Sequence, residues 1–376
     1  MIFLTYNDPP GGIYYSQVTD VCHFLKKEFN VNIRLVALIS VRKFWVNRKQ
    51  IKKEFKDSTV LPMFPKVRNW KLNSITLLFV FLLLDSKKII ARGPFAASLS
   101  IMLKKIGLVK WVCFDSRGAS FFEMREYGIA KEMRVKDEIF NIEQNAILDS
   151  DYRIAISRAL LHYWNEVFAY KGLSHSVIPC TLNSKLFNKI ADEVSLLSKR
   201  KELGFSDTDI IIVYSGSSAG WQSLNLMDSF LETQLKSNDN VKVLLLAKEI
   251  PAKLKVTGEF TNRVVCKWVK EQEVPDLLSV CDYGVLLRGR SMTNKVASPV
   301  KFAEYLSSGL KILISEQIGD CSQFVIENEA GTVVDDFKNV PVLSKLKYSE
   351  KKRLHNLAQS FFTKEKYRSS YEGLVG

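Results

Sequence analysis

The sequence predicts an α/β protein of two doubly wound domains that face a shared cleft, and three observations lead to this fold class. Short apolar runs of strand length alternate with amphipathic segments of helical length, which is typical of parallel sheets covered by helices on both faces. The alternation occurs twice along the chain, on either side of a proline-containing stretch at residues 176–183. With 376 residues, 47% of them hydrophobic, the chain is long enough to bury two cores.

The expected strands form two series, with helices such as 15–29 and 96–106 between them. The strands of the first series are residues 2–5, 32–37, 88–91, 110–114 and 152–156. Those of the second series are residues 210–214, 241–246, 263–266, 283–287 and 311–314. Ligands of doubly wound sheets bind at the carboxyl ends of the strands, so functional residues are expected in the loops that follow these runs.

Composition and spacing exclude several classes of protein. The six cysteines and four histidines show no CxxC or HExxH spacing, so neither a zinc site nor a disulfide framework is expected. The longest apolar run, residues 75–84, is about half of the roughly 20 residues that a bilayer span needs. Residues 1–8 show no secretory signal. We expect a cytoplasmic protein without a bound metal or cofactor.

The positive charge is concentrated in the first half of the chain. The net charge is +14, and residues 26–110 hold 19 basic but only four acidic side chains. The segment 42–53 mixes aromatic and basic residues, which suits an anionic membrane surface, a nucleic acid or a solvated helix face. No nucleic-acid-binding motif accompanies it, so we expect a peripheral position on the inner membrane face and no nucleic-acid partner. Residues 72–84 are expected to form a buried core helix, or alternatively a helix docked at the same surface.

The segment 282–311 carries the most informative pattern. An expected strand ends at Leu287, and a polar loop follows it. A helix then begins, with Ser298 as N-cap and Pro299 at the first helical position, and it ends at Gly309. The loop and the helix start therefore lie at the carboxyl end of a strand, where a ligand site is expected.

Basic side chains gather at this helix start. Lys301 lies in the first turn, where a cation opposes the helix dipole unless an anion is bound there. The N–H groups near Ser298, with Lys301 and the loop residues Arg288 and Arg290, are suited to a diphosphate, and Glu304 to a pair of hydroxyls. The alternative is a surface ion pair between Lys301 and Glu304, which are three residues apart.

Other expected strand ends also carry glycine and charge. Residues 215–223 form a glycine- and serine-rich loop that begins with Gly216 and Ser217 after its strand. It is neither a P-loop nor a dinucleotide fingerprint, so it is either a phosphate cradle or a plain connection. In the first half, Gly11-Gly12, Arg92 and the stretch 115–118 follow three expected strands and are candidates for the acceptor side of a cleft.

The segment 282–309 resembles the donor-binding region of GT-B glycosyltransferases of family 4. One large branch of that family has the pattern Pro-x-Lys-x-x-Glu-x-x-x-x-Gly, which Pro299, Lys301, Glu304 and Gly309 match. The loop that begins at Gly216 resembles the glycine loop of the family's second domain. Gly11-Gly12 resembles the corresponding loop of the first, so the resemblance covers both halves of the chain.

The resemblance implies the GT-B arrangement of two Rossmann-like domains facing a cleft. Residues 1–178 would bind the acceptor, residues 179–360 the nucleotide-sugar donor, and residues 361–376 would form a helix that packs back on the first domain. The implied activity is transfer of a sugar, with retention, to a glycan or lipid-linked acceptor in cell-surface polysaccharide synthesis. A UDP-sugar is expected in preference to a GDP-sugar.

The resemblance also implies roles for single residues. Glu304 would hold the ribose hydroxyls, Lys301 and the amides near Ser298 would hold the diphosphate, and Gly216 would approach the phosphates. Many relatives carry a sugar-contacting glutamate where this chain has Val296, so Asn294 or loop amides are expected to contact the sugar.

Two further departures concern charge and catalysis. The Arg and Lys that are usual in the family's glycine loop are Ser217 and Gln222 here, so Arg288 or Arg290 is expected to supply the phosphate charge. A histidine that is common in the first domain is replaced by residues 115–117. Asp115 and Arg117 are therefore the expected catalytic-site residues, which orient the acceptor.

Two other functions compete with the transferase. A nucleotide-sugar 2-epimerase would share the two-domain layout but needs acid/base carboxylates and histidines, and none of the four histidines lies at a clear strand end. A non-catalytic nucleotide-sugar-binding subunit is the other alternative, suggested by Val296, Ser217 and Gln222.

Overall fold

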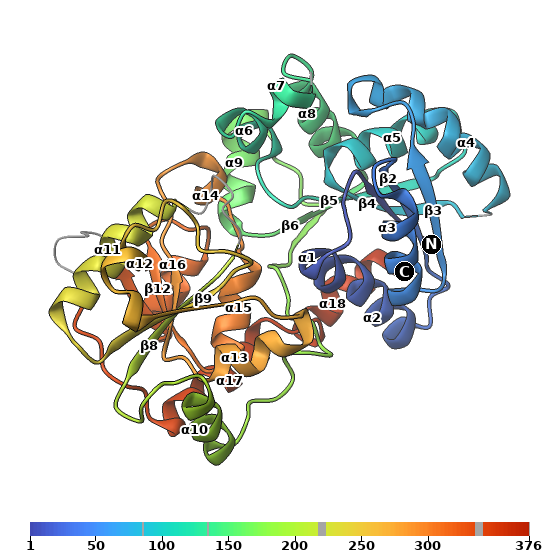
Figure 1. Ribbon diagram of the computed structural model, residues 1–376. Coiled ribbons are helices and arrows are strands. Elements are labelled where there is room, and N and C mark those ends of the chain that lie inside the picture. Colours follow the sequence, from blue (N-terminus) through green and yellow to red (C-terminus); the bar gives the residue numbers. More distant parts are fainter. Residues whose placement is uncertain (85, 134, 217–222, 335–340, 376) are drawn as a thin grey trace. The chain divides into compact units, whose positions relative to one another are not determined.

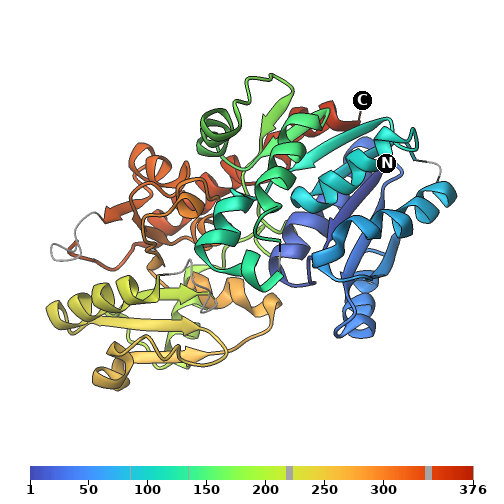
Figure 2. The same cartoon turned by 90° about the horizontal axis from the view of Figure 1, so that it is seen from above.

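The computed structural model describes residues 1–84, 86–133, 135–216, 223–334 and 341–375 (Figure 1). The chain divides into two compact units. Unit 1 comprises residues 1–183 and 364–376, and unit 2 comprises residues 184–363. Each unit is a parallel sheet with helices on both faces (Figures 1 and 2), which confirms the expected class of two doubly wound α/β domains.

The sheet of unit 1 has seven parallel strands. In sheet order they are β3 (Ser58–Met63), β2 (Arg34–Ser40), β1 (Ile2–Tyr6), β4 (Lys88–Arg92), β5 (Trp111–Asp115), β6 (Tyr152–Ala155) and β7 (His175–Val177). The strand order reverses between β1 and β4, and this switch point is where doubly wound sheets bind ligands. All five expected strands are present.

The sequence reasoning missed β3 and β7. Strand β3 contains Pro62, which lacks the N–H that an inner strand must donate, and the strand lies at the edge of the sheet. Strand β7 has three residues, and its last two belong to the stretch 176–183 that separates the two expected series of strands. Pairing with β6 extends the backbone there. The chain leaves unit 1 after Asn183.

Helices cover both faces of this sheet. On one face α1 (Gly12–Tyr14) continues through a π-helical turn (Tyr15–Thr19) into α2 (Asp20–Phe29), beside α3 (Phe44–Glu54) and α18 (Arg368–Val375). The other face carries the 3-10 turn Val67–Leu72, α4 (Asn73–Leu83), α5 (Gly93–Lys105), α8 (Ile139–Asp149) and α9 (Arg158–Phe168), with α6 (Ser120–Glu126) and α7 (Ile129–Met133) near them.

The C-terminal segment belongs to unit 1. Tyr371 and Leu374 of α18 lie in the same hydrophobic core as the first helices. The Lys364 ammonium is buried and pairs with the Asp20 carboxylate at 2.5 Å (Nζ to Oδ2). The expected domain limits at residues 178 and 360 lie close to the divisions after Asn183 and Thr363.

Helix α4 departs from the expectation of a buried core helix. Leu77 and Phe81 are buried, but the side that carries Ile75, Phe79 and Leu82 is exposed to solvent. The whole segment Asn73–Leu83 is apolar or uncharged, so its sequence has no polar stripe to mark the outer side. That expectation is therefore wrong for half of the helix surface.

Unit 2 has a six-stranded parallel sheet with its switch point between β8 and β11. In sheet order its strands are β10 (Val264–Lys267), β9 (Val241–Leu246), β8 (Ile210–Ser215), β11 (Tyr283–Leu286), β12 (Lys311–Ser315) and β13 (Gly331–Val334). Its helices are α10 (Glu193–Glu202), α11 (Leu224–Ser237), α12 (Val256–Glu259), α13 (Val274–Ser279), α14 (Met292–Lys295), α15 (Val300–Ser307), α16 (Cys321–Glu327) and α17 (Tyr348–Phe361). The five expected strands are present.

The edge strand β13 was not expected. It is four residues long and begins with a glycine, and it pairs only with β12. A Cβ on Gly331 would lie 2.0 Å from the carbonyl oxygen of Ile312, so close backbone approach requires the glycine. Such a short edge strand has no apolar run of its own by which a sequence could predict it.

None of the helices in the described ranges is long and apolar enough to cross a membrane.

Candidate functional site

The loops after β8 and β11 meet at the switch point of unit 2. The Gly289 N–H, in the loop after β11, donates a hydrogen bond to Ser223 Oγ at 2.7 Å. Ser223 lies just before α11, which follows β8. Gly216 immediately follows β8, whereas Ser217 and Gln222 lie outside the described residues. The structure therefore brings the two sequence-predicted loops together.

Helix α15 is tied to the same strand ends through Tyr305. The Tyr305 ring is fully buried, and its hydroxyl accepts a hydrogen bond at 2.8 Å from the N–H of Ser215, the last residue of β8. The ring packs against Gly284 of β11, where an added Cβ would lie only 2.2 Å from a ring carbon. Gly284 is thus required by this close packing, which holds α15 against the switch point.

The helix start differs from the expectation by one residue. Helix α15 begins at Val300 with Pro299 as its N-cap, not at Pro299 with Ser298 as N-cap. Proline fixes only φ, and the ψ of Pro299 is 125°, which is an extended value. The Phe302 N–H bonds the Pro299 carbonyl at 3.0 Å, whereas the N–H groups before it have no intrahelical acceptor and the N-cap supplies no side-chain cap.

Lys301 and Glu304 form an ion pair at this helix start. Lys301 Nζ lies 2.6 Å from Glu304 Oε2, and both side chains are partly buried. The alternative that the sequence left open, a pair between residues three apart, is therefore the arrangement in this structure. The pair still lies in the first two turns of α15, beside the uncapped N–H groups.

The two arginines of the loop after β11 have different surroundings. Arg288 is half-buried, and its N–H donates to Ser315 Oγ at 2.8 Å. Arg290 is 83% exposed and pairs with Glu316 at 2.9 Å (Nη2 to Oε2). Arg288 is therefore held at the strand ends, whereas Arg290 extends into solvent.

Asn294 forms hydrogen bonds to other residues of this loop. Its buried amide donates from Nδ2 to the Gly289 carbonyl at 3.0 Å, and Oδ1 accepts from Arg288 Nη1 at 3.4 Å. Two residues further on, Val296 is fully buried. Both polar ends of Asn294 are thus used to shape the loop.

Tyr214 is a site residue that the sequence reasoning missed. Its side chain is buried next to Gly216, where an added Cβ would lie 2.9 Å from the tyrosine hydroxyl. Burial raises the pKa of Tyr214 to about 12, so the hydroxyl stays protonated at neutral pH. The available signal was a tyrosine near the end of the otherwise aliphatic run of β8.

The switch point of unit 1 has glycine at both helix starts. Gly11 is the N-cap of α1 and Gly12 its first residue, and a Cβ on Gly11 would meet nothing within 4 Å. Arg92 ends β4 and is the N-cap of α5, which starts at Gly93 with φ 79°. Arg92 Nε donates to Asp8 Oδ2 at 2.8 Å, which joins the loop after β1 to the end of β4.

The predicted catalytic residues of unit 1 belong to a buried ion-pair network. Asp115 Oδ1 accepts from Arg117 Nη1 at 3.1 Å, and Asp115 Oδ2 lies 3.6 Å from Arg92 Nη1. Arg117 Nη2 also donates to Gln17 Oε1 at 2.9 Å, a contact that the sequence did not indicate. Burial lowers the pKa of Arg117, but the neighbouring Asp115 and Cys180 raise it by more, so its guanidinium stays charged. With both oxygens engaged and its side chain buried, Asp115 is placed to position its neighbours.

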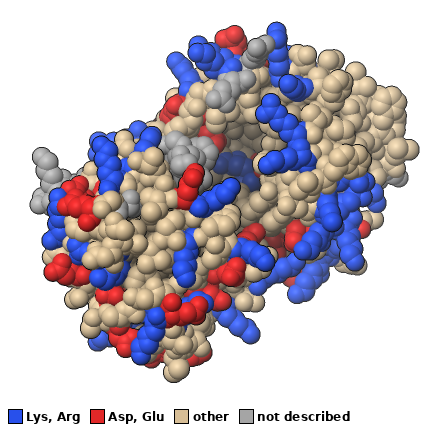
Figure 3. All heavy atoms as spheres, in the orientation of Figure 1, with Lys and Arg blue, Asp and Glu red and all other residues tan. Residues whose placement is uncertain are grey.

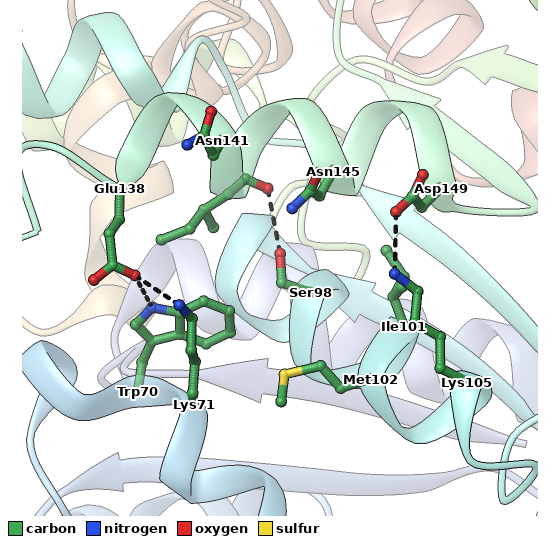
Figure 4. A pocket seen from close by; sticks show the side chains of 11 residues that line it. Trp70, Lys71, Ser98, Ile101, Met102, Lys105, Glu138, Asn141, Asn145 and Asp149 are labelled. Atoms are coloured by element: carbon green, nitrogen blue, oxygen red, sulfur yellow. Dashed lines mark hydrogen bonds and ion pairs between the residues drawn. The ribbon is translucent and has the colours of Figure 1, made fainter.

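A separate pocket of about 240 Å³ lies in unit 1 beside α5 and α8 (Figure 4). Glu138 pairs with Lys71 at 3.3 Å on one side of it, and Asp149 pairs with Lys105 at 3.7 Å on the other. None of the sequence-predicted site residues lines this pocket. Across the described ranges, no group of three His, Cys, Asp or Glu side chains is arranged to hold a metal ion.

No protein-family model matches the chain, and no curated protein matches its sequence. Solved structures do match over its whole length. The sucrose-phosphate synthase of Thermosynechococcus elongatus has a TM-score of 0.69 at 12% identity, covering 99% of this chain and 97% of that one. A glycosyltransferase of Rickettsia africae has a TM-score of 0.69 at 13% identity, covering 100% and 98%.

The Anabaena protein HepE, solved in complex with UDP and glucose, has a TM-score of 0.65 at 11% identity, covering 99% and 98% of the two chains. A putative UDP-N-acetylglucosamine 2-epimerase of Listeria monocytogenes matches with a TM-score of 0.54 at 10% identity, covering 100% and 89%. At these identities the likeness establishes the fold, and the chain has the two-domain GT-B fold.

Proposed function

We propose that the protein is a family 4-like GT-B glycosyltransferase that moves a sugar from a nucleotide-sugar donor to a glycan or lipid-linked acceptor. The observation that carries this proposal is the attachment of α15 to the switch point of unit 2. The Tyr305 hydroxyl binds the last N–H of β8, so the helix that holds Lys301 and Glu304 starts beside the loops after β8 and β11. The structural likeness to HepE, which was solved with UDP and glucose, supports a nucleotide-sugar donor.

In this proposal the donor diphosphate binds at the start of α15. The uncapped N–H groups after Pro299 and the Lys301 ammonium would face the phosphates. Binding would draw Lys301 Nζ away from Glu304, whose carboxylate then accepts hydrogen bonds from the ribose hydroxyls. The half-buried Arg288 would supply further positive charge, and Gly216 would let the phosphates approach the backbone.

The loop after β11 would recognise the sugar. Val296 is buried and cannot replace the carboxylate that many relatives have at this position. Asn294 holds the Gly289 carbonyl and Arg288, so it would act on the sugar mainly by shaping the loop amides. We infer UDP as the nucleotide in preference to GDP.

The acceptor would bind unit 1 near Gly11, Gly12 and Arg92. An acceptor oxygen attacks the anomeric carbon, the bond from that carbon to the diphosphate oxygen breaks, and the departing phosphate takes the acceptor proton. This front-face transfer retains the anomeric configuration and needs no side-chain base. The rate then comes from positioning and from charge stabilisation of the leaving diphosphate, with Asp115 and Arg117 as positioning residues.

The excess of positive charge in the first half of the chain supports an acceptor that is anchored in a membrane. We propose that the protein works at the inner face of the membrane, in cell-surface polysaccharide synthesis. The acceptor would be lipid-linked, and the protein would be peripheral, held by anionic lipids.

The test is binding and turnover of nucleotide sugars. Thermal stabilisation against a panel of nucleoside diphosphates and their sugar conjugates identifies the donor, and calorimetry then measures its affinity. Lys301→Ala and Glu304→Ala should each weaken donor binding about tenfold, because each removes a charged hydrogen bond. Lys199→Ala is the matched control, since Lys199 and Glu202 form a pair of the same spacing in α10.

Equal donor affinity in the wild type and in both α15 variants would remove the proposed site. Slow release of the free nucleoside diphosphate from one sugar donor supports the transferase. Binding without release would favour a second candidate, a non-catalytic nucleotide-sugar-binding subunit. The closed Lys301–Glu304 pair and the buried Val296 are the observations in its favour.

A further inference from the structure

Helix α4 presents an apolar side to solvent. No charged residue occurs between Asn73 and Leu83, the side chains Leu77 and Phe81 are buried, and α4 packs against α5. On the opposite side the exposed fractions lie between 52% and 85% for five large apolar side chains. They are Leu72, Ile75, Phe79, Leu82 and Leu83, and together they form the α4 surface. A continuous apolar strip of this kind on a protein marks a binding surface.

Apolar side chains are also exposed at the neighbouring strand ends. Strands β2 and β3 end in register, with Ser40 opposite Met63. The next residues, Val41 and Phe64, are both exposed, and so is Trp45 in the first turn of α3. Phe64 is followed by the 3-10 turn that leads into α4, so the α4 surface begins at the carboxyl edge of the sheet.

Cations lie between these apolar residues. Arg42 and Lys43 follow Val41, and Lys66 and Arg68 lie between Phe64 and Leu72. All four side chains are exposed, and no carboxylate in the described part of the chain lies within ion-pair distance of them. In Figure 3, Lys and Arg side chains gather beside an uncharged area that lies over α4, at the right of the view.

We propose that the α4 surface docks unit 1 on an anionic lipid bilayer. The apolar side of α4 would enter the boundary between headgroups and acyl chains, and Arg42, Lys43, Lys66 and Arg68 would meet the anionic headgroups. An apolar strip alone would suit a second protein as well as a bilayer, so the positive charge beside the strip decides between these two partners. Four exposed cations without acidic partners match a negative surface and would repel a second copy of the same surface.

This inference adds a membrane-docking surface to the proposed function. The relevance of that surface to catalysis rests on the proposed function. The strands of unit 1 are parallel, so the tips of β2 and β3 lie on the same edge of the sheet as Gly11, after β1, and Arg92, at the end of β4. A bilayer at the α4 surface would therefore bring a lipid-linked acceptor to the edge that holds the proposed acceptor residues. Docking itself involves neither the donor nor the acceptor.

The experiment measures co-sedimentation of the full chain with vesicles of phosphatidylcholine, with and without phosphatidylglycerol. The wild type should bind the anionic vesicles, and salt should weaken this binding. The double variant Phe79→Glu/Leu82→Glu should lose at least about tenfold in partitioning, because it puts two charges on the inserted side. The control is Val194→Glu/Ile326→Glu, since these side chains are similarly exposed on helices of unit 2.

A second pair of variants tests the cations. Arg42→Glu/Arg68→Glu should lose at least about tenfold in binding to the anionic vesicles. The control Lys248→Glu/Lys253→Glu makes the same change in net charge in unit 2 and should stay within about twofold. Circular dichroism and thermal unfolding check that the exposed substitutions leave the fold intact.

Three outcomes would overturn the proposal: no binding of the wild type to anionic vesicles, equal losses in the α4 and control variants, or concentration-dependent self-association that Phe79→Glu/Leu82→Glu abolishes. Duplex DNA binding without vesicle binding would assign the cations to nucleic acid and also overturn it. Glu304→Ala separates this inference from the proposed function, because it should bind vesicles like the wild type even where the donor site fails.

Discussion

The two switch points of this protein are built alike but differ in how their charges are used. In unit 1 Arg92 and Arg117 share the buried Asp115 carboxylate at the strand ends, and Asp8 is a second carboxylate beside Arg92. In unit 2 the charged residues at the strand ends are partly exposed, and the Lys301–Glu304 pair lies at the uncapped start of α15. A largely buried network whose carboxylate is fully engaged positions backbone and side chains, whereas a partly exposed pair can exchange one partner for a ligand. The same topology thus carries a largely buried ion-pair network in one unit and the proposed anion site in the other.

The largest expected effect comes from breaking the network of unit 1. Asp115→Ala leaves the Arg92 and Arg117 guanidinium groups without their shared carboxylate in a buried site. Removing one partner of a buried ion pair costs about 3 kcal/mol of the free energy of unfolding. Urea unfolding followed by tryptophan fluorescence measures the loss. The exposed pair in α10 is the reference, and Lys199→Ala should cost less than about 1 kcal/mol.

Asp115→Asn tests whether Asp115 positions its neighbours or acts as a general base. If Asp115 acted as a general base, the amide would abolish turnover while leaving stability near that of the wild type. As a positioning residue, it should instead lose stability and activity together. A stable but inactive Asp115→Asn variant would contradict the role assigned to the network.

The next effect concerns the attachment of α15 in unit 2. Gly284→Ala places a Cβ against the Tyr305 ring and should cost about 2 kcal/mol of the free energy of unfolding through overpacking. Donor affinity should fall with it, because α15 moves relative to β8. Gly258→Ala is the control, since a Cβ there would meet nothing within 4 Å. Unchanged calorimetric affinity in a destabilised Gly284→Ala variant would separate packing from binding and count against the site.

Substitution of the two arginines in the loop after β11 should change only the donor affinity, and mainly at one of the two positions. Arg288→Ala should weaken binding of the nucleoside diphosphate about tenfold, because it removes a half-buried guanidinium that contacts Asn294 Oδ1 at 3.4 Å. Arg290→Ala should change the affinity less than about twofold, since Arg290 is solvated and pairs with Glu316. Calorimetry on both variants decides which arginine serves the phosphates, and the reverse ranking would show the placement to be wrong.

The last expected effect is a pH dependence of the stability of unit 1. Glu143 of α8 accepts hydrogen bonds from the N–H groups of Ser120 and Phe121 at the start of α6. Burial nevertheless raises the pKa of its carboxyl to about 8, well above the usual value for an exposed glutamate. The folded state therefore holds a proton that the unfolded state has released, and stability should fall as the pH rises from about 5 to 8.

Glu143→Gln removes this titration. Its free energy of unfolding should vary less over that range, because the wild type loses roughly 1.4 kcal/mol for each pKa unit by which Glu143 is raised and the variant does not. Denaturant unfolding at several pH values measures both slopes. Equal slopes in the two proteins would show that Glu143 is ionised in the folded state.

The sequence predicted the elements that are buried on both faces. Strands such as β8, with the sequence IIIVYS, read as unbroken apolar runs because helices cover both sides of a parallel sheet. The same reasoning placed the loop after β11 and the helix with Lys301 and Glu304. The edge strands β3, β7 and β13 were not predicted, because β3 contains a proline and β7 and β13 are short, whereas the edge strand β10 was predicted from its run Val264-Val265-Cys266.

The site was predictable only in part. Glycine, arginine and lysine at strand ends pointed to loops that lie at the two switch points, but the partners of these residues come from distant segments. Asp115 meets Arg92 across neighbouring strands, and Arg117 meets Gln17, 100 residues away. The fit of Tyr305 against Gly284, and with it the position of α15, likewise depends on packing between separate elements.

By itself the sequence determined that two apolar alternations form two doubly wound sheets, since each strand carries the hydrophobic run that burial demands. It also determined where the chemistry-bearing loops follow those strands. Only the tertiary structure decided which charges pair with one another and that α4 keeps one apolar side in solvent. The physical reason is that ion pairing and burial depend on what packs beside a residue, and neighbours in space are not neighbours in the chain.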